Sequence, residues 1–478
     1  MLGALCSVVW PGAGHLAVRA PLRWHVIVAG ALNGMALAST VVIVSRIDDR
    51  ADLAEVIADR RVLLLLCANL VVLALTRLWT AIDVARAAKP VTALRRVAAG
   101  FSVCTVVVMG VAPLAVAADY VWVTDRTVER VFGSVDAVTA NPTPIATTTT
   151  APDPADTSTS TSSTTSTTLP PATPFADYGR VNVLLLGGDA GPGRWSLRTD
   201  TMVVVSIDPA TGDTAMISVP RNLPRLPFPP DSELGKRFPR GFTDLANAVY
   251  PYVTQRPELV GGVADAGAQA IKLGIAQLLG LPIHFYVLVD MAGFVDVVDA
   301  LGGIDIYIAK SVPSPGNPRD AKHQVPVYIT AGQQHLDGTL ALAYARSRHA
   351  DNDYYRMARQ RCVLGAIAAK ATPSVLATGF TDLLGALADA VTTDIPRSAL
   401  GDFAIVIDRF QQHGGLATVR TLHLAPPFYQ SSSWKANEVR GMVAAILTPP
   451  PAPVPGEAAV TTVPTPTDGT PVLAEQCR

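Results

Sequence analysis

The chain has 478 residues, of which 49% are hydrophobic and only 16% are charged, with a formal net charge of -1. This length exceeds what one compact core usually holds, and so apolar a composition indicates membrane-spanning segments. The near-neutral charge gives no sign of the basic surface that a nucleic-acid partner requires.

Three apolar runs come first along the chain, at about residues 24–44, 62–84 and 97–121. Each has the roughly 20 residues that a helix needs to cross the hydrocarbon core of a bilayer. The loop between the second and third runs carries four basic residues and no acid, whereas the loop after the first run mixes both signs. Because basic loops stay in the cytoplasm, we expect a multi-pass membrane region over residues 1–122, with the rest of the chain outside the cell membrane.

Two low-complexity segments flank the part of the chain that is expected to fold. Residues 141–174 are dominated by Thr, Ser and Pro and cannot bury enough apolar surface to fold. We expect an extracytoplasmic linker over 123–177, a folded domain over 178–448 and a disordered Pro-rich tail over 449–478. A bridge between Cys362 and Cys477 is one possibility in an oxidising compartment.

The expected folded domain alternates strands with helices. Short apolar runs at 181–186, 202–207, 214–219, 284–289 and 304–308 predict strands, and runs at 262–279 and 293–301 predict helices. Asp337 is placed to cap a further helix, and another helix is expected to begin near Tyr354. This alternation predicts an α/β layered domain.

Two carboxylates bracket a Gly-rich loop after the first of these strands. Asp189 ends the strand and Asp200 begins the next one, with no His or Cys beside them. Carboxylates alone suit a hard cation such as Mg2+, whose sites hold one or two carboxylates completed by water and substrate phosphates. The alternative is that both are turn residues on a surface loop, and the spacing alone favours that alternative.

An arginine cluster is the second candidate site. Its members surround the start of a predicted helix: Arg346, Arg348, Arg356, Arg359 and Arg361. Positive charges at a helix N-terminus oppose the helix dipole, and Asp351 and Asp353 are too few to pair every arginine. A bound diphosphate would neutralise the excess, and a solvated, self-paired surface helix is the alternative.

Other common catalytic signatures do not occur in the sequence. It has no Gly-x-Ser-x-Gly elbow, no Walker loop and no Cys-x-x-Cys pair. The histidines show no metal-ligand spacing, and His284 and His349 are interpreted as structural or supporting residues. The candidate chemistry therefore depends on the carboxylates and arginines.

Six motifs follow one another in chain order. They are VNVLLLGGD at 181–189, RTDTM at 198–202, SVPR at 218–221, DALGGID at 299–305, LDGTLALAYARSRH at 336–349 and DYYRMARQ at 353–360. Together they resemble the motifs of the LytR-CpsA-Psr family. The resemblance covers about residues 180–371 and continues more weakly to about 447.

The resemblance implies an α/β/α sandwich with an extracytoplasmic catalytic face, in a transferase of the actinobacterial type. Members of this family move teichoic acid, capsular polysaccharide or arabinogalactan from a polyprenyl diphosphate to a peptidoglycan hydroxyl and release polyprenyl phosphate. The implied partners are the lipid-linked glycan, the peptidoglycan acceptor and the lipid bilayer, and no nucleic acid is implied.

The resemblance also assigns roles to individual residues. It implies that Asp189 and Asp200 hold Mg2+. The diphosphate would be bound by Arg198, Arg221, Arg346, Arg348, Arg356 and Arg359. The implied catalytic residues are Arg221, Arg346, Arg348 and Asp353, the last of which orients arginines or serves as an acid or base.

The sequence departs from the family pattern at Asn222, Tyr355, Ala358 and Arg361, and it follows the family's Asn-centred motif only loosely, around Asn247. These changes concern substrate identity and proton transfer more than the diphosphate site. Three alternatives stay open: a lipid-diphosphate hydrolase, a non-catalytic glycolipid-binding protein and a transcriptional regulator. The expected topology disfavours the regulator because the folded domain lies outside and the cytoplasmic loops are short.

Overall fold

The computed structural model describes residues 24–47, 50–87, 97, 101, 104–132, 175, 177–189, 197–315, 328–348, 353–371, 380–425, 434–448 and 477. The chain divides into two compact units. The first unit comprises Met1–Ser134, Phe380–Ala388 and Pro396–Ala404, and the second comprises Val135–Gly379, Asp389–Ile395 and Ile405–Arg478. Two short segments of the predicted 178–448 domain therefore group with the N-terminal helices.

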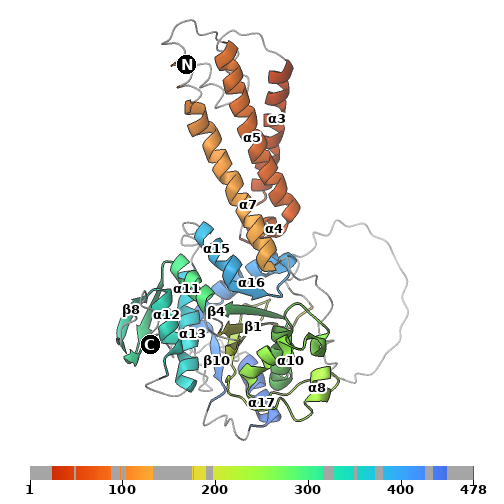
Figure 1. Ribbon diagram of the computed structural model, residues 1–478, viewed down its shortest axis with the longest axis vertical. Coiled ribbons are helices and arrows are strands. Elements are labelled where there is room, and N and C mark those ends of the chain that lie inside the picture. The colour runs from red at the N-terminus through yellow and green to blue at the C-terminus, as the bar shows by residue number, and fades with distance from the viewer. Residues whose placement is uncertain are drawn as a thin grey trace, which may run out of the picture. The chain divides into compact units, whose positions relative to one another are not determined.

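The first unit contains three helices that are long and apolar enough to cross a membrane (Figure 1). They are α3 (Trp24–Val44), α5 (Arg60–Ala87) and α7 (Ala112–Phe132), which follows a short π-helix, η1 (Val107–Val111). The short helix α4 (Arg50–Ala58) lies between α3 and α5 in the chain. Within the described residues the third candidate span covers Cys104–Phe132, and α7 continues past residue 122 because no Gly or Pro occurs over 123–132.

Polar contacts join the separate segments of the first unit. The Asn33 amide donates to the Thr76 hydroxyl at 3.0 Å and links α3 to α5. The buried carboxylate of Asp125 on α7 pairs with Arg397 at 2.9 Å. The same guanidinium donates to the Ala58 carbonyl at 2.7 Å, which places η4 (Arg397–Ala399) in this unit.

The second unit is built on a six-stranded mixed sheet of order β10-β3-β2-β1-β4-β9. Its strands are β1 (Val181–Gly188), β2 (Thr199–Ile207), β3 (Thr214–Ser218), β4 (Phe285–Asp290), β9 (Val391–Thr393) and β10 (Arg420–His423). The β1–β4 and β3–β10 pairs are parallel, and the other neighbours are antiparallel. The central strand β1 is a nearly continuous apolar run, as expected for a strand covered on both faces.

Alternating side chains of the sheet face two cores, so helices cover both faces. On one face, Leu184, Leu186, Met202, Val204 and Ile217 pack with α10 (Ala266–Leu279) and α17 (Ala436–Leu447). On the other face, Leu185, Val203, Val205 and Met216 contact Leu364 of α13 (Asp353–Lys370) and Phe410 of α16 (Leu400–Gln412). The predicted α/β/α sandwich is confirmed (Figure 1).

The remaining elements form a side core and the surface loops. The pair β5 (Ile304–Ile308) and β8 (Gly332–Leu336) packs with α11 (Met291–Ala300), α12 (Gly338–Arg346) and α13. Asp337 caps α12 by accepting from the Leu340 amide at 2.8 Å, as predicted. The other elements of this unit are α8 (Glu233–Arg237), η2 (Ala246–Ala248), α9 (Val249–Thr254), η3 (Pro257–Val260), β6 (Val312–Pro313), β7 (Tyr328–Ile329) and η5 (Gly415–Thr418). Most of α15 (Phe380–Ala390) belongs to the first unit.

A disulfide joins the C-terminal end of the chain to this side core. Cys362 of α13 and Cys477 are bonded, with their Cα atoms 5.5 Å apart and 115 positions between them in the sequence. Both sulfurs lie among apolar side chains of the second unit. The bridge that the sequence left open is therefore formed, and the predicted tail over 449–478 is anchored at Cys477.

Candidate active site

The two predicted metal carboxylates come from neighbouring strands at one edge of the sheet. Asp189 directly follows β1, and its amide donates to the Arg198 carbonyl at 2.8 Å. Asp200 lies on β2, beside Thr201, which pairs with Gly187 of β1. The antiparallel pairing of β1 and β2 therefore brings both carboxylates to the same edge, with the exposed Arg198 between them in the chain.

Asp200 is held by side chains from two later segments. Its Oδ2 accepts from Nη1 of Arg221 at 2.5 Å, and its Oδ1 accepts from the Asn247 amide at 3.0 Å. The backbone N–H of Asn247 donates to the Arg221 carbonyl at 3.1 Å and joins the two partners. Pro220, which has no N–H to continue the ladder, follows the end of β3 and turns the chain so that Arg221 reaches Asp200.

Asp353 collects three guanidinium groups at the start of α13. Arg356 donates to it through Nε and Nη2, each at 3.0 Å. Nε of Arg221 lies 3.3 Å from the same carboxylate, and Nη1 of Arg348 lies 3.9 Å away. An aspartate in the first helical turn also complements the helix dipole. Arg221 thus bridges Asp200 and Asp353, and the two carboxylates share three arginines.

Burial makes this excess of positive charge costly. The side chain of Arg356 is only 4% exposed. Burial lowers the pKa of Arg356, and the nearby Asp353 opposes that shift. Arginine nevertheless keeps its proton in proteins. An additional anion at the cluster would stabilise a charge that Asp353 alone does not balance.

The other predicted arginines lie differently. Arg359 is buried, donates to the Ser347 carbonyl and lies 6.0 Å from the Tyr344 ring centroid. Arg361 is 1% exposed and donates to the Ser218 hydroxyl at 3.2 Å, and burial lowers the pKa of Arg361 to about 10. Arg346 ends α12 and is half-buried. The predicted phosphate-binding roles of Arg198, Arg346 and Arg359 stay predictions.

The donor chemistry around Asp200 fits a hard cation. Within the described ranges no three His, Cys, Asp or Glu side chains gather as a metal cage. Oδ1 of Asn247 is buried and accepts no hydrogen bond within those ranges. Mg2+ sites typically hold one or two carboxylates and take their remaining ligands from water and phosphate oxygens. The carboxylates of Asp189 and Asp200 fit such an ion by their chemistry, and their role as its ligands stays a prediction.

His284 makes contacts typical of a structural residue. Nδ1 of His284 accepts from the Asn182 amide at 3.0 Å, and its ring stacks on Tyr178 at a centroid distance of 4.2 Å. Burial, with the nearby Lys272, lowers the pKa of His284 to about 4, so the ring stays neutral. His349 and Asp351 lie outside the described residues. Asn247 is the site residue that the sequence marked least clearly, because only a loose motif pointed to it.

The fold and this cluster define a class of protein: an α/β/α sandwich that presents arginines in excess, beside two carboxylates, at one edge of its sheet. The LytR_cpsA_psr family model matches residues 145–423. That range is more than half of the chain, and the chain belongs to the LytR-CpsA-Psr family.

Relatives with descriptive names are found over part of the chain. The polyisoprenyl-teichoic acid–peptidoglycan teichoic acid transferase TagU of Bacillus anthracis is 29% identical over 224 residues, covering 46% of this chain and 63% of the relative. TagU of Oceanobacillus iheyensis is 31% identical over 224 residues, covering 46% and 60%. The chain thus matches less than two thirds of these relatives' length. The crystal structure of B. subtilis TagV is 25% identical, with a TM-score of 0.39, covering 56% of this chain and 98% of TagV.

Proposed function

We propose that the chain is a membrane-anchored phosphotransferase that attaches a polyprenyl-diphosphate-linked glycopolymer to peptidoglycan and releases polyprenyl phosphate. The observation that carries this proposal is the cluster at Asp353, where three guanidinium groups share one carboxylate. A diphosphate supplies the missing negative charge, and planar arginine forks bind phosphate oxygens in pairs. The transferase names of the relatives support a glycopolymer as the transferred group.

The proposed reaction is a displacement at phosphorus. A muramic hydroxyl oxygen bonds to the sugar-proximal phosphorus, the bond from that phosphorus to the bridging oxygen breaks, and polyprenyl monophosphate leaves. The hydroxyl proton passes to solvent or to the departing phosphate. Arg221 and Arg356 are positioned to stabilise the charge that grows on the phosphate oxygens. Asp353 acts as a positioning residue because its oxygens already accept from these arginines.

Mg2+ is part of the proposal. Asp189 and Asp200 would hold the ion together with the diphosphate oxygens. When bound, it would neutralise phosphate charge and support departure of the bridging oxygen. Arg221 and Asn247 orient the Asp200 carboxylate for that role through hydrogen bonds of 2.5 and 3.0 Å.

The membrane part of the proposal follows from the three apolar helices. We infer that all three cross the cell membrane and that the second unit works outside it, where peptidoglycan is found. A membrane anchor raises the effective concentration of a lipid-borne substrate at the enzyme. Protease accessibility on intact cells tests this orientation. Digestion of the second unit only after cell lysis would contradict it.

The decisive experiment uses the full chain in lipid nanodiscs with a synthetic polyprenyl-diphosphate glycan, Mg2+ and peptidoglycan fragments. Release of polyprenyl phosphate and linkage of glycan to the fragments are measured together. Linked product that disappears with EDTA and returns with Mg2+ is expected. Release without linkage would replace the transferase by a hydrolase, and donor binding without release would replace it by a binding protein. Linkage that survives EDTA would reject the metal assignment alone.

A further inference from the structure

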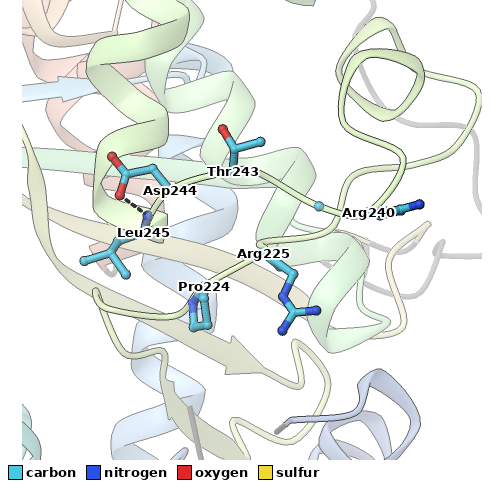
Figure 2. Close-up of a pocket in the computed structure, with 7 residues that line it drawn as sticks. Pro224, Arg225, Arg240, Thr243, Asp244 and Leu245 are labelled. Carbon is cyan, nitrogen blue, oxygen red and sulfur yellow. Dashed lines mark hydrogen bonds between the residues drawn. The ribbon is translucent and has the colours of Figure 1, made fainter. Parts of the chain in front are cut away.

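A surface hollow lies beside the site on the two segments that lead into it (Figure 2). It has a volume of about 440 Å³ and is lined by Pro224, Arg225, Arg240, Gly241, Thr243, Asp244 and Leu245. This volume is within the usual range of small-ligand sites, about 300–1,000 Å³. The arginine cluster at Asp353 does not line this hollow.

The hollow is close to Asp200 along both segments. Pro224 follows Arg221 by three residues, and Leu245 precedes Asn247 by two residues. At roughly 3.5 Å per residue, these positions are within about 11 Å and 7 Å of the two side chains that hold Asp200. The hollow therefore lies on the same two segments that carry the side chains holding Asp200.

Hydrogen bonds join the two segments to each other and to a third segment at Trp434. The Phe242 amide donates to the Leu226 carbonyl at 2.9 Å, and the indole N–H of Trp434 donates to the Pro224 carbonyl at 3.0 Å. Gly241 has φ +83°, and a Cβ there would lie 2.3 Å from the Arg225 carbonyl oxygen. Arg225 itself adopts φ +56°, which is unfavourable for a side chain larger than that of glycine. Strain of this kind is typical of positions that serve binding.

The lining combines charge, hydrogen-bonding groups and an apolar surface. Arg225 and Arg240 are exposed, and neither forms an ion pair with any residue in the described ranges. The Asp244 carboxylate accepts from the Leu245 amide at 2.7 Å and, with Thr243, faces solvent (Figure 2). Pro224 and the exposed Leu245 offer the apolar contact that the C–H face of a sugar ring requires.

We propose that this hollow is a subsite for an anionic saccharide unit, bound by Arg225 and Arg240, of one of the two glycans that meet at the site. The arginines bind its phosphate or carboxylate, Thr243 and Asp244 bind its hydroxyl groups, and Pro224 with Leu245 contacts its ring. The inference depends on the proposed function for the identity of the glycans. The anion belongs either to a phosphodiester of the donor polymer or to a carboxylate of the peptidoglycan acceptor.

Binding of lipid-free probes to the full chain in nanodiscs tests the subsite without turnover. The probes are a phosphodiester-linked oligosaccharide, a muramyl peptide with free carboxylates and the same muramyl peptide fully amidated. We expect one anionic probe to bind and Arg225→Gln/Arg240→Gln to weaken it about tenfold or more, because a charge-assisted contact is lost. The amidated probe should bind weakly to every form.

The matched control is Arg237→Gln, which removes the same charge from a nearby exposed arginine that hydrogen-bonds Tyr252 instead of lining the hollow. It should leave probe binding unchanged. Arg225→Lys/Arg240→Lys should recover part of the affinity. If a change at the strained Arg225 disturbs folding, Arg240→Gln alone decides the result. Equal loss in the control, no loss in the double variant, or no binding of either anionic probe overturns the proposal.

Turnover then identifies the source of the anion. If the phosphodiester probe binds, the Arg225→Gln/Arg240→Gln variant should have a KM for the donor that is about tenfold higher than that of the wild type. If the muramyl peptide binds, the same variant should show this rise in the KM for the acceptor. In both cases kcat should stay within about twofold. Arginine-dependent probe binding without any transfer would reject the proposed transferase while keeping the subsite. Transfer with KM values that are the same in the wild type and in the double variant would reject the subsite while keeping the transferase.

Discussion

Two ion-pair clusters of the second unit differ in how their charges are balanced. At the sheet edge, Asp353 is shared by three arginines, and the exposed Arg348 is among them. On the other cluster, Lys272 is 8% exposed and pairs with one carboxylate, Asp394. The Lys272 ammonium also donates to the His284 carbonyl at 2.9 Å, and Asp394 accepts from the Tyr286 amide at 2.6 Å.

The difference indicates that the Asp353 cluster binds an anion and that the Lys272 cluster stabilises the fold. In the Lys272 cluster one ammonium is matched by one carboxylate, and both also bond to backbone groups, which links α10, β4 and the segment after β9. The Asp353 cluster has more guanidinium groups than carboxylates and opens to solvent, so an added anion completes it. Substitutions in the Lys272 cluster should therefore change the free energy of unfolding, and substitutions around Asp200 and Asp353 should change the rate.

The largest expected effect is on stability, at the Lys272 cluster. Lys272→Met leaves the Asp394 carboxylate without its cation in a mostly buried position, and removing one partner of a buried pair costs about 3–5 kcal/mol. Thermal unfolding of the full chain should show a clear fall in the melting temperature of the second unit. The rate per folded molecule should hardly change.

The exposed pair of Lys236 and Glu233 supplies the control for this variant. Lys236→Met removes the same charge where water replaces the partner, so the melting temperature should stay almost unchanged. A similar loss in both variants, or a large loss of rate in folded Lys272→Met, would contradict the contrast between the clusters.

The next effect is kinetic. Asp200→Asn keeps the shape of the side chain but removes the charge that pairs with Arg221 and that would hold Mg2+. Losing one preorganised charged partner costs about 3–4 kcal/mol of barrier, or roughly a hundredfold to a thousandfold in rate. Turnover with the lipid-linked donor measures the loss, and the melting temperature should move little.

Asp231→Asn is the matched control because it neutralises an exposed aspartate of the same unit. Its rate should equal that of the wild type. Near-normal turnover in Asp200→Asn would remove Asp200 from the proposed metal and phosphate site. Loss of rate together with a melting temperature far below that of the control would assign Asp200 to stability instead.

How far the sequence predicted these clusters depends on where their contacts come from. Strands β1 to β4 and the Asp337 cap follow from local patterns, and the structure places them at nearly the predicted residues. The two outer strands of the sheet, β9 and β10, were not predicted because each has only three or four residues. The arginines were visible because they crowd around one helix start. The sequence did not predict which arginines contact Asp353 and which are buried in the interior, because the pattern does not say whether Arg359 or Arg361 points inward.

Long-range contacts account for what the sequence did not predict. The Lys272–Asp394 pair joins residues 122 positions apart, and no local motif marks either one. The Cys362–Cys477 bridge was one possibility among several because spacing alone does not give a disulfide pairing. Pro396–Ala404 groups with the first unit, and its Arg397 pairs with Asp125 there, a contact between residues that are far apart in the sequence.

The third expected effect tests whether the Asp353 cluster depends on the Cys362–Cys477 disulfide. Cys362 directly follows Arg361 on α13, so the disulfide holds the helix that carries the site. Cys477→Ser removes a covalent link across 115 positions and should cost about 2–4 kcal/mol of stability. The melting temperature measures this loss, and kcat at low temperature should stay within about twofold.

Reducing agent supplies an independent comparison for the disulfide. Wild-type protein treated with dithiothreitol should unfold like untreated Cys477→Ser, whereas the variant should not respond further. A fall in kcat that matches the fall in stability would mean that the disulfide positions the arginines. An unchanged melting temperature would show that α13 is held by its packing alone.

The smallest expected effect concerns His284, whose carbonyl accepts a hydrogen bond from Lys272. Burial and Lys272 lower the pKa of His284 to about 4, below its usual value near 6.5. The folded state therefore binds fewer protons than the unfolded state between these values, and stability is fully present above about pH 6.5. As pH falls toward 4, this histidine removes at most about 1.4 kcal/mol per pH unit, and its partial exposure reduces that figure. Unfolding midpoints measured from pH 7 to pH 4.5 give the slope.

His284→Asn isolates that contribution because its amide oxygen can replace Nδ1 as the acceptor for the Asn182 amide, now held at 3.0 Å. The variant loses the stacking on Tyr178, so its midpoint should be lower at pH 7. Its midpoint should nevertheless fall less between pH 6.5 and pH 4.5 than that of the wild type. Equal slopes would show that His284 takes up its proton without cost, in which case the cluster around Lys272 is open to charge in the same way as the cluster around Asp353.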